Sequence, residues 1–143
     1  MRKINNAGLN LIKNAEGFSP IPYYCSGGIL TIGYGSTGSH VKPGMHISKA
    51  EADMFLMRDL HDAESAVSRL ITRKLNDNQY AALVSFTFNL GSGKLQASTL
   101  RRKCNDGFDE EVATEFLKWV FGGGRRLSGL VKRRRAEADL YQA

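Results

Sequence analysis

The sequence lacks several features that mark whole classes of protein. Its only cysteines, Cys25 and Cys104, stand far apart without CxxC or Cys/His metal spacing. We therefore predict two free thiols, no disulfide framework and no metal site. No apolar run approaches the roughly 18 residues of a membrane span, and the first residues hold no apolar segment of signal-peptide length. We expect a protein that is made in the cytoplasm and does not insert stably into a membrane, unless a native N-terminal anchor has been removed.

Acidic residues are missing from one long stretch. No Asp or Glu occurs between Glu16 and Glu51. In the whole chain, 20 Lys and Arg stand against 14 Asp and Glu, which gives a formal net charge of +6. An excess of basic over acidic residues favours an anionic partner such as nucleic acid, a membrane surface or a cell-wall polymer. Charge alone does not choose among them.

The chain combines one glycine-rich segment with helical segments. Its 143 residues and 42% hydrophobic content predict a single domain, 1–143, with two lobes. Apolar residues at helical spacing predict a first helix that ends near Glu16. From Gly17 to Gly44 the sequence is rich in glycine and holds all three prolines, with β-prone IPYY and ILTIGYG on either side of SGG. This pattern predicts a hairpin in a small lobe of about residues 14–50.

The remaining sequence predicts helices. Ser48 and Glu51 form a capping-box pattern, and the apolar positions that follow predict one long connecting helix over about residues 48–72. Asn76 begins a helix that is apolar on nearly all sides and is therefore expected to be buried. Further helices are expected in LQASTLRRKCNDG, in FDEEVATEFLKWVF with Asp109 as N-cap, and in LSGLVKRRRAEADLYQA. The fold class is α+β, with a helical lobe of about residues 73–143 plus the N-terminal helix.

Three residues in the opening third of the chain suggest a chemistry. Glycoside hydrolysis usually needs one protonated carboxylic acid for the leaving oxygen and a second polar group that handles water or the sugar cation. Glu16 is a candidate for the acid because it stands where a helix meets glycine-rich loops. The hairpin has no second carboxylate, so Cys25 and Thr31 are the candidates for the second role. The ordinary alternatives are a solvated charge, a small turn residue and a β-branched strand residue.

The spacing of these three residues resembles a known signature. Eight residues separate Glu16 from Cys25 and five separate Cys25 from Thr31. This spacing is similar to the Glu, Asp-or-Cys, Thr signature of the phage T4-type lysozymes, the endolysins of glycoside hydrolase family 24. TIGYG resembles the hairpin of that family, and FNLGSGKLQASTL and KWVFGGGRRLSGLVKRRRAEADLY resemble its middle and C-terminal blocks. The resemblance covers almost the whole chain and implies a lysozyme-like fold whose lobes are joined by a long helix.

The resemblance also implies roles for the three residues. Glu16 matches the general acid, Cys25 stands where many relatives have aspartate, and Thr31 matches the threonine that holds the attacking water. Ser36 is a departure, because relatives often have histidine there. A free thiol has a pKa of about 8.5 and a neighbouring carboxylate raises it, so we expect Cys25 and Thr31 to position water and the anomeric centre to invert. The rival hypothesis is covalent attack by sulfur, with retention.

Four further residues are expected to contact substrate. The resemblance places FTFNLG opposite the hairpin across a cleft, which makes Phe88 and Asn89 candidates, and Thr99 matches a family contact position. Tyr34 of the GYG motif is the fourth candidate. The alternatives are a core role for the phenylalanine and a C-terminal cap for Asn89.

Two other features have competing interpretations. Trp119, on the helix expected around Phe116, is more typical of a buried core aromatic than of a substrate contact. The basic run from Lys132 to Arg135 has the charge to contact phosphates, but no nucleic-acid-binding motif accompanies it. A solvated face with partly packed arginine stems is the commoner outcome, and one arginine is a candidate partner for Glu16 or a core acid.

The resemblance implies a function. An endolysin of this family hydrolyses the β-1,4 bond between N-acetylmuramic acid and N-acetylglucosamine in peptidoglycan, without metal or organic cofactor. It waits in the host cytoplasm, needs a holin to reach the periplasm and cell wall, acts as a monomer and binds no nucleic acid. Two alternatives stay open: a basic nucleic-acid-binding helical domain, and a wall-binding relative without catalytic activity.

Overall fold

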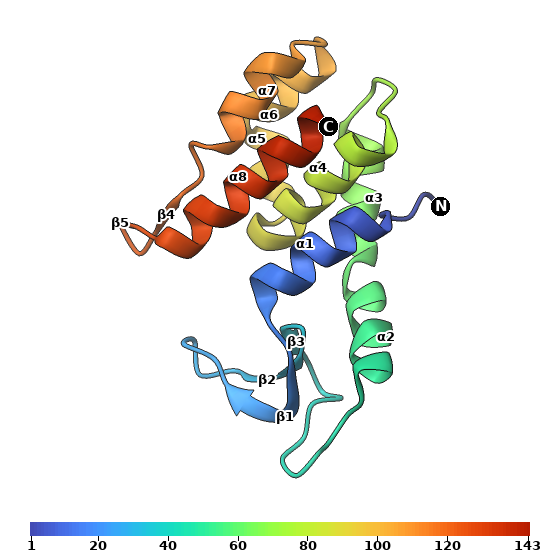
Figure 1. The fold of residues 1–143 in the computed structure, drawn as a ribbon, viewed down its shortest axis with the longest axis vertical. Coiled ribbons are helices and arrows are strands. Elements are labelled where there is room, and N and C mark those ends of the chain that lie inside the picture. The colour runs from blue at the N-terminus through green and yellow to red at the C-terminus, as the bar shows by residue number, and fades with distance from the viewer. The chain divides into compact units, whose positions relative to one another are not determined.

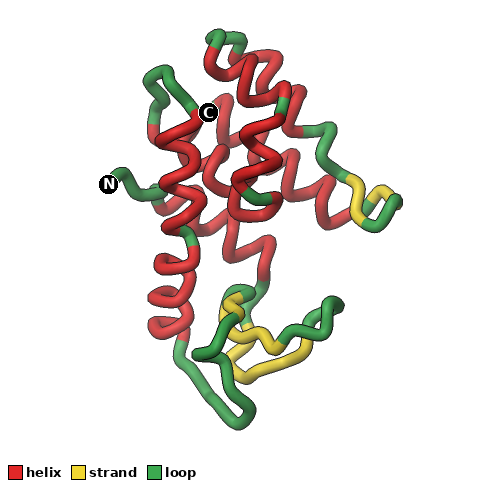
Figure 2. Tube along the Cα trace, turned by 180° about the vertical axis from the view of Figure 1, so that it is seen from behind, coloured by secondary structure: helices red, strands yellow, loops and turns green.

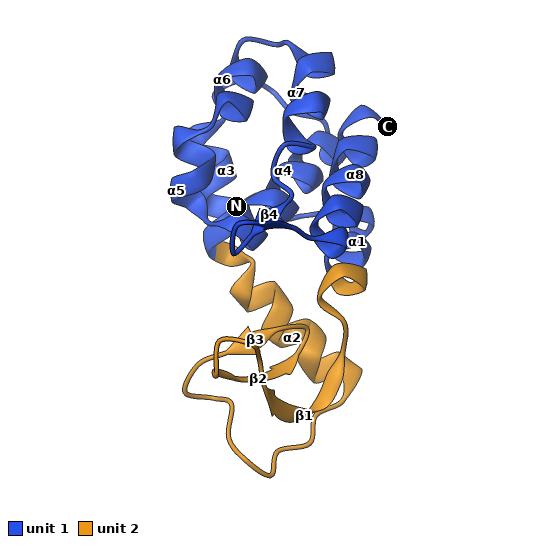
Figure 3. Cartoon of the chain, turned by 90° about the vertical axis from the view of Figure 1, so that its left-hand side faces the viewer, with its two compact units in different colours: residues 1–12, 62–143 blue, residues 13–61 orange.

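The computed structural model describes residues 1–143, which form two compact units. Unit 1 comprises residues 1–12 and 62–143, and unit 2 comprises residues 13–61 (Figure 3). Unit 2 corresponds to the predicted small lobe plus the first part of the predicted connecting helix. The mixed fold of helices and small antiparallel sheets confirms the predicted α+β class. None of the helices has both the length and the apolar content needed to span a bilayer.

Unit 2 is built on a three-stranded antiparallel sheet in the order β1-β2-β3, with bounds β1 Ser19–Tyr24, β2 Leu30–Gly33 and β3 Ser36–Thr37 (Figure 2). The central strand carries Thr31, which pairs with Tyr23 on one side and with Thr37 on the other. Residues directly opposite each other in antiparallel strands share a face, so these three side chains lie on the same side of the sheet. The predicted hairpin is therefore confirmed and gains a short third strand.

Helix α2 (Lys49–Asp59) covers part of this sheet. It begins at Ser48, whose hydroxyl accepts a hydrogen bond from the Glu51 amide at 3.1 Å, and the Glu51 carboxylate accepts one from the Ser48 amide at 3.2 Å. The predicted capping box is thus confirmed. Ala52 lies so near Gly33 that a Cβ on the glycine would come within 3.2 Å of the alanine methyl group. This close approach allows α2 to pack directly on the sheet.

The predicted connecting helix is interrupted. Helix α2 ends at Asp59 and α3 (His61–Leu70) begins two residues later, with Leu60 between them. Leu60 keeps a right-handed helical conformation, with φ −74° and ψ −15°, and its amide donates to the Leu56 carbonyl at 2.9 Å. Apolar spacing therefore continues unbroken through Leu60, which explains why the sequence pattern predicts a single helix.

Unit 1 is a helical assembly around α4 (Asp77–Leu90), which lies beside α8 (Ser128–Gln142) (Figure 1). Asn76 caps α4 with a second capping box, and the middle of this helix is buried, as predicted. The other helices are α1 (Asn6–Glu16), which begins in unit 1, α3, α5 (Ser92–Ala97), α6 (Thr99–Asn105) and α7 (Asp109–Phe116). The short strands β4 (Phe121–Gly122) and β5 (Arg125–Arg126) form a hairpin before α8.

Two local predictions in unit 1 are wrong. The N-cap of α7 is Phe108, not Asp109. The Asp109 carboxylate instead accepts hydrogen bonds from Arg73 and from the Tyr141 hydroxyl, so it is not available as a cap. Trp119 lies beyond the end of α7 rather than on it, but its ring contacts the Phe86 ring at 5.4 Å between centroids. Trp119 thus packs against a core aromatic ring, but it is half-buried rather than buried as predicted.

Candidate functional site

Glu16 is the last residue of α1, and glycine fixes its surroundings. Gly17 ends the helix with φ +74°, and its amide donates to the Lys13 carbonyl at 2.9 Å. The half-buried Glu16 side chain lies against the turn between β2 and β3: a Cβ on Gly35 would come within 3.0 Å of its Oε1 atom. Gly35 also has φ +81°, so both the conformation of the turn and the room for the carboxylate require glycine.

Cys25 sits in the tight turn that joins β1 to β2. Its amide donates to the Ile29 carbonyl at 3.0 Å, and its carbonyl accepts from the Gly28 amide at 2.8 Å. Backbone hydrogen bonds from Ile29 and Gly27, followed by one with the Thr31 side chain, lower the pKa of the Cys25 thiol below its usual value. The expectation of a raised pKa is therefore wrong, because local hydrogen-bond donors stabilise the thiolate.

Thr31 completes this pair from the central strand. It is only 3% exposed, and its hydroxyl donates to the Ile29 carbonyl at 2.9 Å. Its side chain also helps to lower the pKa of Cys25, which means that it favours the thiolate over the neutral thiol. When the thiol ionises, the hydroxyl proton can turn toward the sulfur. The pair thus supplies a polar group that can give or take a hydrogen bond.

Tyr34 lies in the core of unit 2. It is 9% exposed, with its ring 5.4 Å from the Phe18 ring and the Lys13 ammonium group 5.4 Å from its centroid. Lys13 also forms an ion pair with Asp53 at 2.8 Å. These contacts give Tyr34 a packing role, and its contact with substrate stays a prediction.

Ser36 stands where relatives are expected to have histidine, and the imidazole of His40 contacts it. Ser36 is buried, and its Oγ atom forms a hydrogen bond with His40 Nε2 at 2.9 Å. The His40 ring also packs edge-on against Phe55 at 4.8 Å. Sequence reasoning missed His40 because nothing in the spacing of these residues indicates that the loop turns back on β3.

The other predicted contact residues belong to unit 1. Phe88 and Asn89 lie half-buried in the last turn of α4, and Thr99 is the exposed first residue of α6. Gly91, not Asn89, is the C-cap of α4. The Asn89 side chain instead accepts a hydrogen bond through Oδ1 from Arg134 Nη2. The capping alternative for Asn89 is therefore wrong, while the substrate contacts of the three residues stay predictions.

A buried polar array holds this end of α4 against α8. Arg134 and Glu137 are fully buried and form an ion pair at 3.2 Å, and the Ser85 hydroxyl donates to Glu137 at 2.6 Å. Arg133 adds a contact of 3.5 Å with Glu137 and donates to the Ser85 carbonyl. Burial lowers the pKa of Arg134, and the negative charge of Glu137 opposes this shift.

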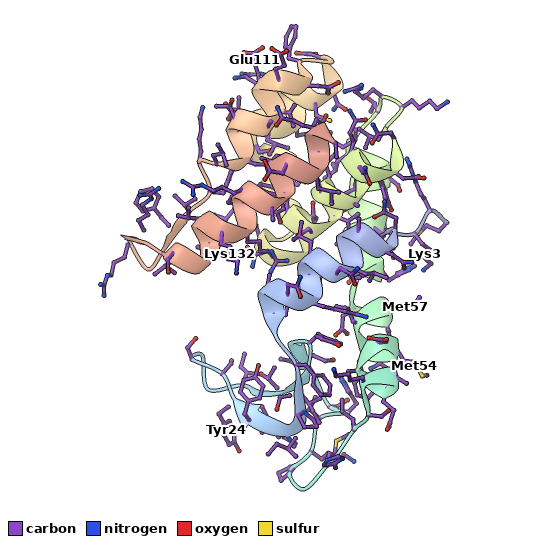
Figure 4. The ribbon with its side chains drawn as sticks, viewed as in Figure 1. Lys3, Tyr24, Met54, Met57, Glu111 and Lys132 are labelled. Atoms are coloured by element: carbon purple, nitrogen blue, oxygen red, sulfur yellow. The ribbon has the colours of Figure 1, made fainter.

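The basic run of α8 is consequently not one solvated face. Arg133 and Arg134 are buried, whereas Lys132 and Arg135 are exposed. Figure 4 labels Lys132 on α8. The structure thus bears out the prediction that an arginine pairs with a core acid. The exposed cations contribute to a surface hollow of about 530 Å³, which is lined by Arg126, Ser128, Val131, Lys132 and Arg135.

Residues 13–137 match the family model described as phage lysozyme. The chain belongs to the phage lysozyme family. It is 41% identical over 140 residues to the endolysin of Bacillus phage B103, a match that covers 96% of the chain and 53% of that protein. The chain thus spans about half the length of the Bacillus phage endolysins that it matches.

Solved structures agree with this membership. A mutant of P22 lysozyme superimposes with a TM-score of 0.92 at 34% identity, and the match covers 100% of both chains. The muramidase domain of SpmX from Asticaccaulis excentricus gives a TM-score of 0.91 at 34% identity, covering 100% of this chain and 99% of that one. In this phage lysozyme family member, Glu16, Cys25 and Thr31 all fall inside unit 2 and inside the matched residues.

Proposed function

We propose that the protein is an endolysin of the T4-type group, glycoside hydrolase family 24, and cleaves the β-1,4 bond between N-acetylmuramic acid and N-acetylglucosamine in peptidoglycan. The observation that carries the proposal is the arrangement of three residues in unit 2. The Thr31 side chain helps to lower the pKa of Cys25, and the strand that holds Thr31 runs into the turn that lies against the Glu16 carboxylate. One small sheet therefore organises an acid and a polar pair.

The proposed reaction assigns each group one role. Protonated Glu16 gives its proton to the glycosidic oxygen as the bond from the anomeric carbon to that oxygen breaks. Thr31 and Cys25 position a water molecule, whose oxygen bonds to the anomeric carbon from the opposite face. The thiolate of Cys25, which the local hydrogen bonds favour, takes the proton that the water loses. The anomeric configuration inverts, and no cofactor takes part.

The family members support the substrate class. Endolysin is the name of the Bacillus phage B103 relative, and muramidase is the name of the Asticaccaulis domain that this chain matches from end to end. The exposed cations at Arg126, Lys132 and Arg135 suit an acidic wall polymer, since charge complementarity raises association rates. We propose that both units act as one lysozyme domain and that Thr99 and Phe88 contact the glycan strand.

The route to the wall is part of the proposal. A monomeric enzyme that folds in the host cytoplasm needs a holin lesion to reach the periplasm and its substrate. Expression of this chain in a Gram-negative host with and without a holin tests the route. Culture density is expected to fall only when the holin is present, and lysis without it would contradict holin dependence.

The nucleic-acid alternative loses its main support. Arg133 and Arg134 are buried with Glu137, so half of the basic run is turned into the protein core. A phosphate-binding face needs those guanidinium groups at the surface. The other alternative, wall binding without catalysis, is separated by the experiment that follows.

Product analysis of digested peptidoglycan tests the proposed reaction. Purified sacculi are incubated with the wild type, with Glu16→Gln and with the control Glu110→Gln, which changes an exposed glutamate on α7. We expect the wild type and the control to release fragments that end in reducing N-acetylmuramic acid, and Glu16→Gln to release none. Fragments that end in reducing N-acetylglucosamine, or in a cyclic anhydro sugar without a reducing end, would contradict the assigned bond or reaction. Binding without release would favour the wall-binding alternative.

A further inference from the structure

The surface hollow on unit 1 gathers positive charge without a counter-charge. It has a volume of about 530 Å³, and the residues that line it are Arg126, Ser128, Val131, Lys132 and Arg135. No acidic residue is among them. The three cations form no ion pair with any acid of the chain, whereas Arg133 and Arg134 pair with Glu137. Like charges that converge on one place repel each other, so an anion that binds there is stabilised by all three.

The spacing of residues along α8 brings these cations to one place. Four of the lining residues lie at positions 128, 131, 132 and 135, a spacing that puts them on one face of the helix. Arg133, Arg134 and Glu137 lie on another face and are buried. Ser128 is the first residue of α8, where the positive end of the helix dipole adds to the charge of the side chains. The basic run is thus divided between an inner half with a partner and an outer half without one.

Arg126 lines the same hollow from the hairpin formed by β4 and β5. It pairs with Phe121 across the hairpin, and the amide of the next residue, Leu127, donates to the Val120 carbonyl at 3.0 Å. A Cβ on Gly122 would come within 2.7 Å of the Leu127 side chain, so the hairpin packs closely against the start of α8. The backbone of Arg126 is therefore fixed beside the helix before any ligand binds.

The lining and the size of the hollow suit an organic phosphate better than a bare anion. A guanidinium group donates two parallel hydrogen bonds to phosphate oxygens, and a lysine adds a point charge. A volume of about 530 Å³ lies in the range of pockets that hold small organic ligands. The half-buried Val131 offers an apolar wall for carbon atoms, and the Ser128 hydroxyl can donate to or accept from a sugar hydroxyl.

We propose that this hollow binds a phosphorylated sugar unit of a bacterial wall polymer, with Arg126, Lys132 and Arg135 on the phosphate group. Val131 and Ser128 contact the sugar. The choice of a wall polymer rests on the proposed function, because an enzyme that cleaves peptidoglycan meets the phosphate-bearing polymers of the wall. The residues assigned to catalysis lie in unit 2, whereas every residue that lines the hollow lies in unit 1. The hollow is therefore assigned to wall binding and not to the reaction.

A double variant, Lys132→Gln with Arg135→Gln, tests the site because glutamine removes both charges and stays polar. Lys74→Gln with Arg102→Gln is the matched control, since both residues are exposed, neither lines the hollow, and the net charge falls by the same amount. The soluble probes are N-acetylglucosamine 6-phosphate, N-acetylglucosamine, glucuronate and inorganic phosphate. The readouts are affinity, melting temperature and the backbone amide NMR signals of the lining residues.

Three further probes identify the source of the phosphate. Bacterial walls that carry phosphate polymers are compared with the same walls after hydrofluoric acid has removed the phosphate. Vesicles that contain phosphatidic acid present the same group on a lipid, and a single-stranded oligonucleotide presents it on a nucleic acid. Retention of each protein on each material is measured.

The expected result is a preference for phosphate that depends on the hollow. N-acetylglucosamine 6-phosphate shifts the amide signals of the lining residues in the wild type, and N-acetylglucosamine and glucuronate bind about tenfold more weakly or worse. The double variant binds the sugar phosphate about tenfold more weakly, since two exposed charge-assisted contacts are lost, and its melting temperature does not fall. It also loses the preference for walls that carry phosphate, whereas the control variant keeps that preference.

Equal binding of the sugar phosphate by the wild type and the double variant would overturn the inference, and so would binding of glucuronate or inorganic phosphate as tight as that of the sugar phosphate. Retention on the vesicles or the oligonucleotide without a preference for phosphate-bearing walls would contradict a wall polymer as the source. Release of reducing ends from the stripped walls is measured with the same proteins. Release with no effect at the hollow refutes the inference alone, whereas a wild type that binds the sugar phosphate but cleaves nothing refutes the proposed function.

Discussion

The Thr31 hydroxyl and the Cys25 amide share one acceptor: both donate to the Ile29 carbonyl, at 2.9 Å and 3.0 Å. The turn backbone and then the Thr31 side chain lower the pKa of the Cys25 thiol. The position at which the family resemblance implies an aspartate in many relatives thus holds a thiol whose environment favours its anion. The chemistry proposed for Cys25 depends on this environment.

Alkylation of Cys25 measures that environment directly. Backbone hydrogen bonds from Ile29 and Gly27, and then the bond with Thr31, lower the pKa of the thiol. The rate of alkylation by iodoacetamide rises with pH as the thiol ionises, and a free thiol gives a midpoint at a pH of about 8.5. We expect the midpoint for Cys25 to lie at a lower pH, and we expect Thr31→Val to move it to a higher pH. Cys104 serves as internal control because it is fully buried and burial raises its pKa. A wild-type midpoint at or above that of a free thiol contradicts the account.

Gly35 provides a test of how tightly Glu16 is placed. In Gly35→Ala the new methyl group would meet Glu16 Oε1 at 3.0 Å, and the alanine would also adopt φ +81°. Gly44→Ala is the matched control, since Gly44 has φ +83° and nothing within 4 Å. We expect both variants to lose about 1 kcal/mol of unfolding free energy, but only Gly35→Ala to lose activity, by tenfold or more in kcat. Equal activity of the two variants would show that the position of the Glu16 carboxylate does not matter.

The stereochemistry of the product distinguishes water attack from sulfur attack. If Cys25 and Thr31 position a water molecule, the first product of a β-linked glycan is the α-anomer. Proton NMR during the first minutes of digestion, before mutarotation, identifies the anomer. Cys25→Asp is expected to remain active with the same outcome, because a carboxylate also accepts the proton from water. A β-anomer as first product, or a trapped thioglycoside on Cys25, would support covalent attack instead.

We expect unit 1 to become less stable at acid pH because Asp109 loses its negative charge. Burial opposes the ionisation of Asp109, but hydrogen bonds from Arg73 and Tyr141 together with the Arg73 charge hold its pKa below the usual value. A lowered carboxyl pKa means that the stabilisation is present above the unfolded-state pKa of about 3.9 and is lost as pH falls through the lower folded-state value. Asp109→Asn is therefore expected to cost about 1 kcal/mol at pH 7 and progressively less below pH of about 4.

Urea unfolding at pH 7 and pH 3 checks this dependence. Asp77→Asn is the control, because the Asp77 side chain is 83% exposed although it pairs with Arg2 at 3.0 Å. The control should change stability little at either pH, since exposed ion pairs contribute little. A cost of Asp109→Asn that is the same at both pH values would refute the role of its ionised form.

Local sequence signals predicted much of the fold. Ser48 with Glu51 and Asn76 before α4 specify their helix starts through side-chain caps, and both caps are present. Two failures have physical causes. Leu60 separates α2 from α3 although its backbone angles are helical, so the sequence pattern does not show the interruption. Asp109 does not cap α7 because its carboxylate forms hydrogen bonds with Arg73 and Tyr141, which are distant in the sequence.

The candidate site was predictable only in part. The spacing of Glu16, Cys25 and Thr31 predicted three site residues, which all lie in unit 2. The direction of the Cys25 pKa shift was not predictable, because it depends on the orientation of the backbone amides in the turn. The buried ion pair of Arg134 was not predictable either, because a run of four basic residues does not indicate which side chains are buried. Which arginines are buried depends on the packing of α8 on α4 and on the position of Glu137.

The rate of reducing-end release from purified sacculi, compared between the wild type and Glu16→Gln, tests the central claim most directly. The account predicts steady release by the wild type and a loss of at least a hundredfold in Glu16→Gln, because a positioned general acid contributes about that much. Both proteins should show the same melting temperature and the same binding to sacculi. Release by Glu16→Gln at a rate near that of the wild type, or no release by the wild type, would contradict the claim.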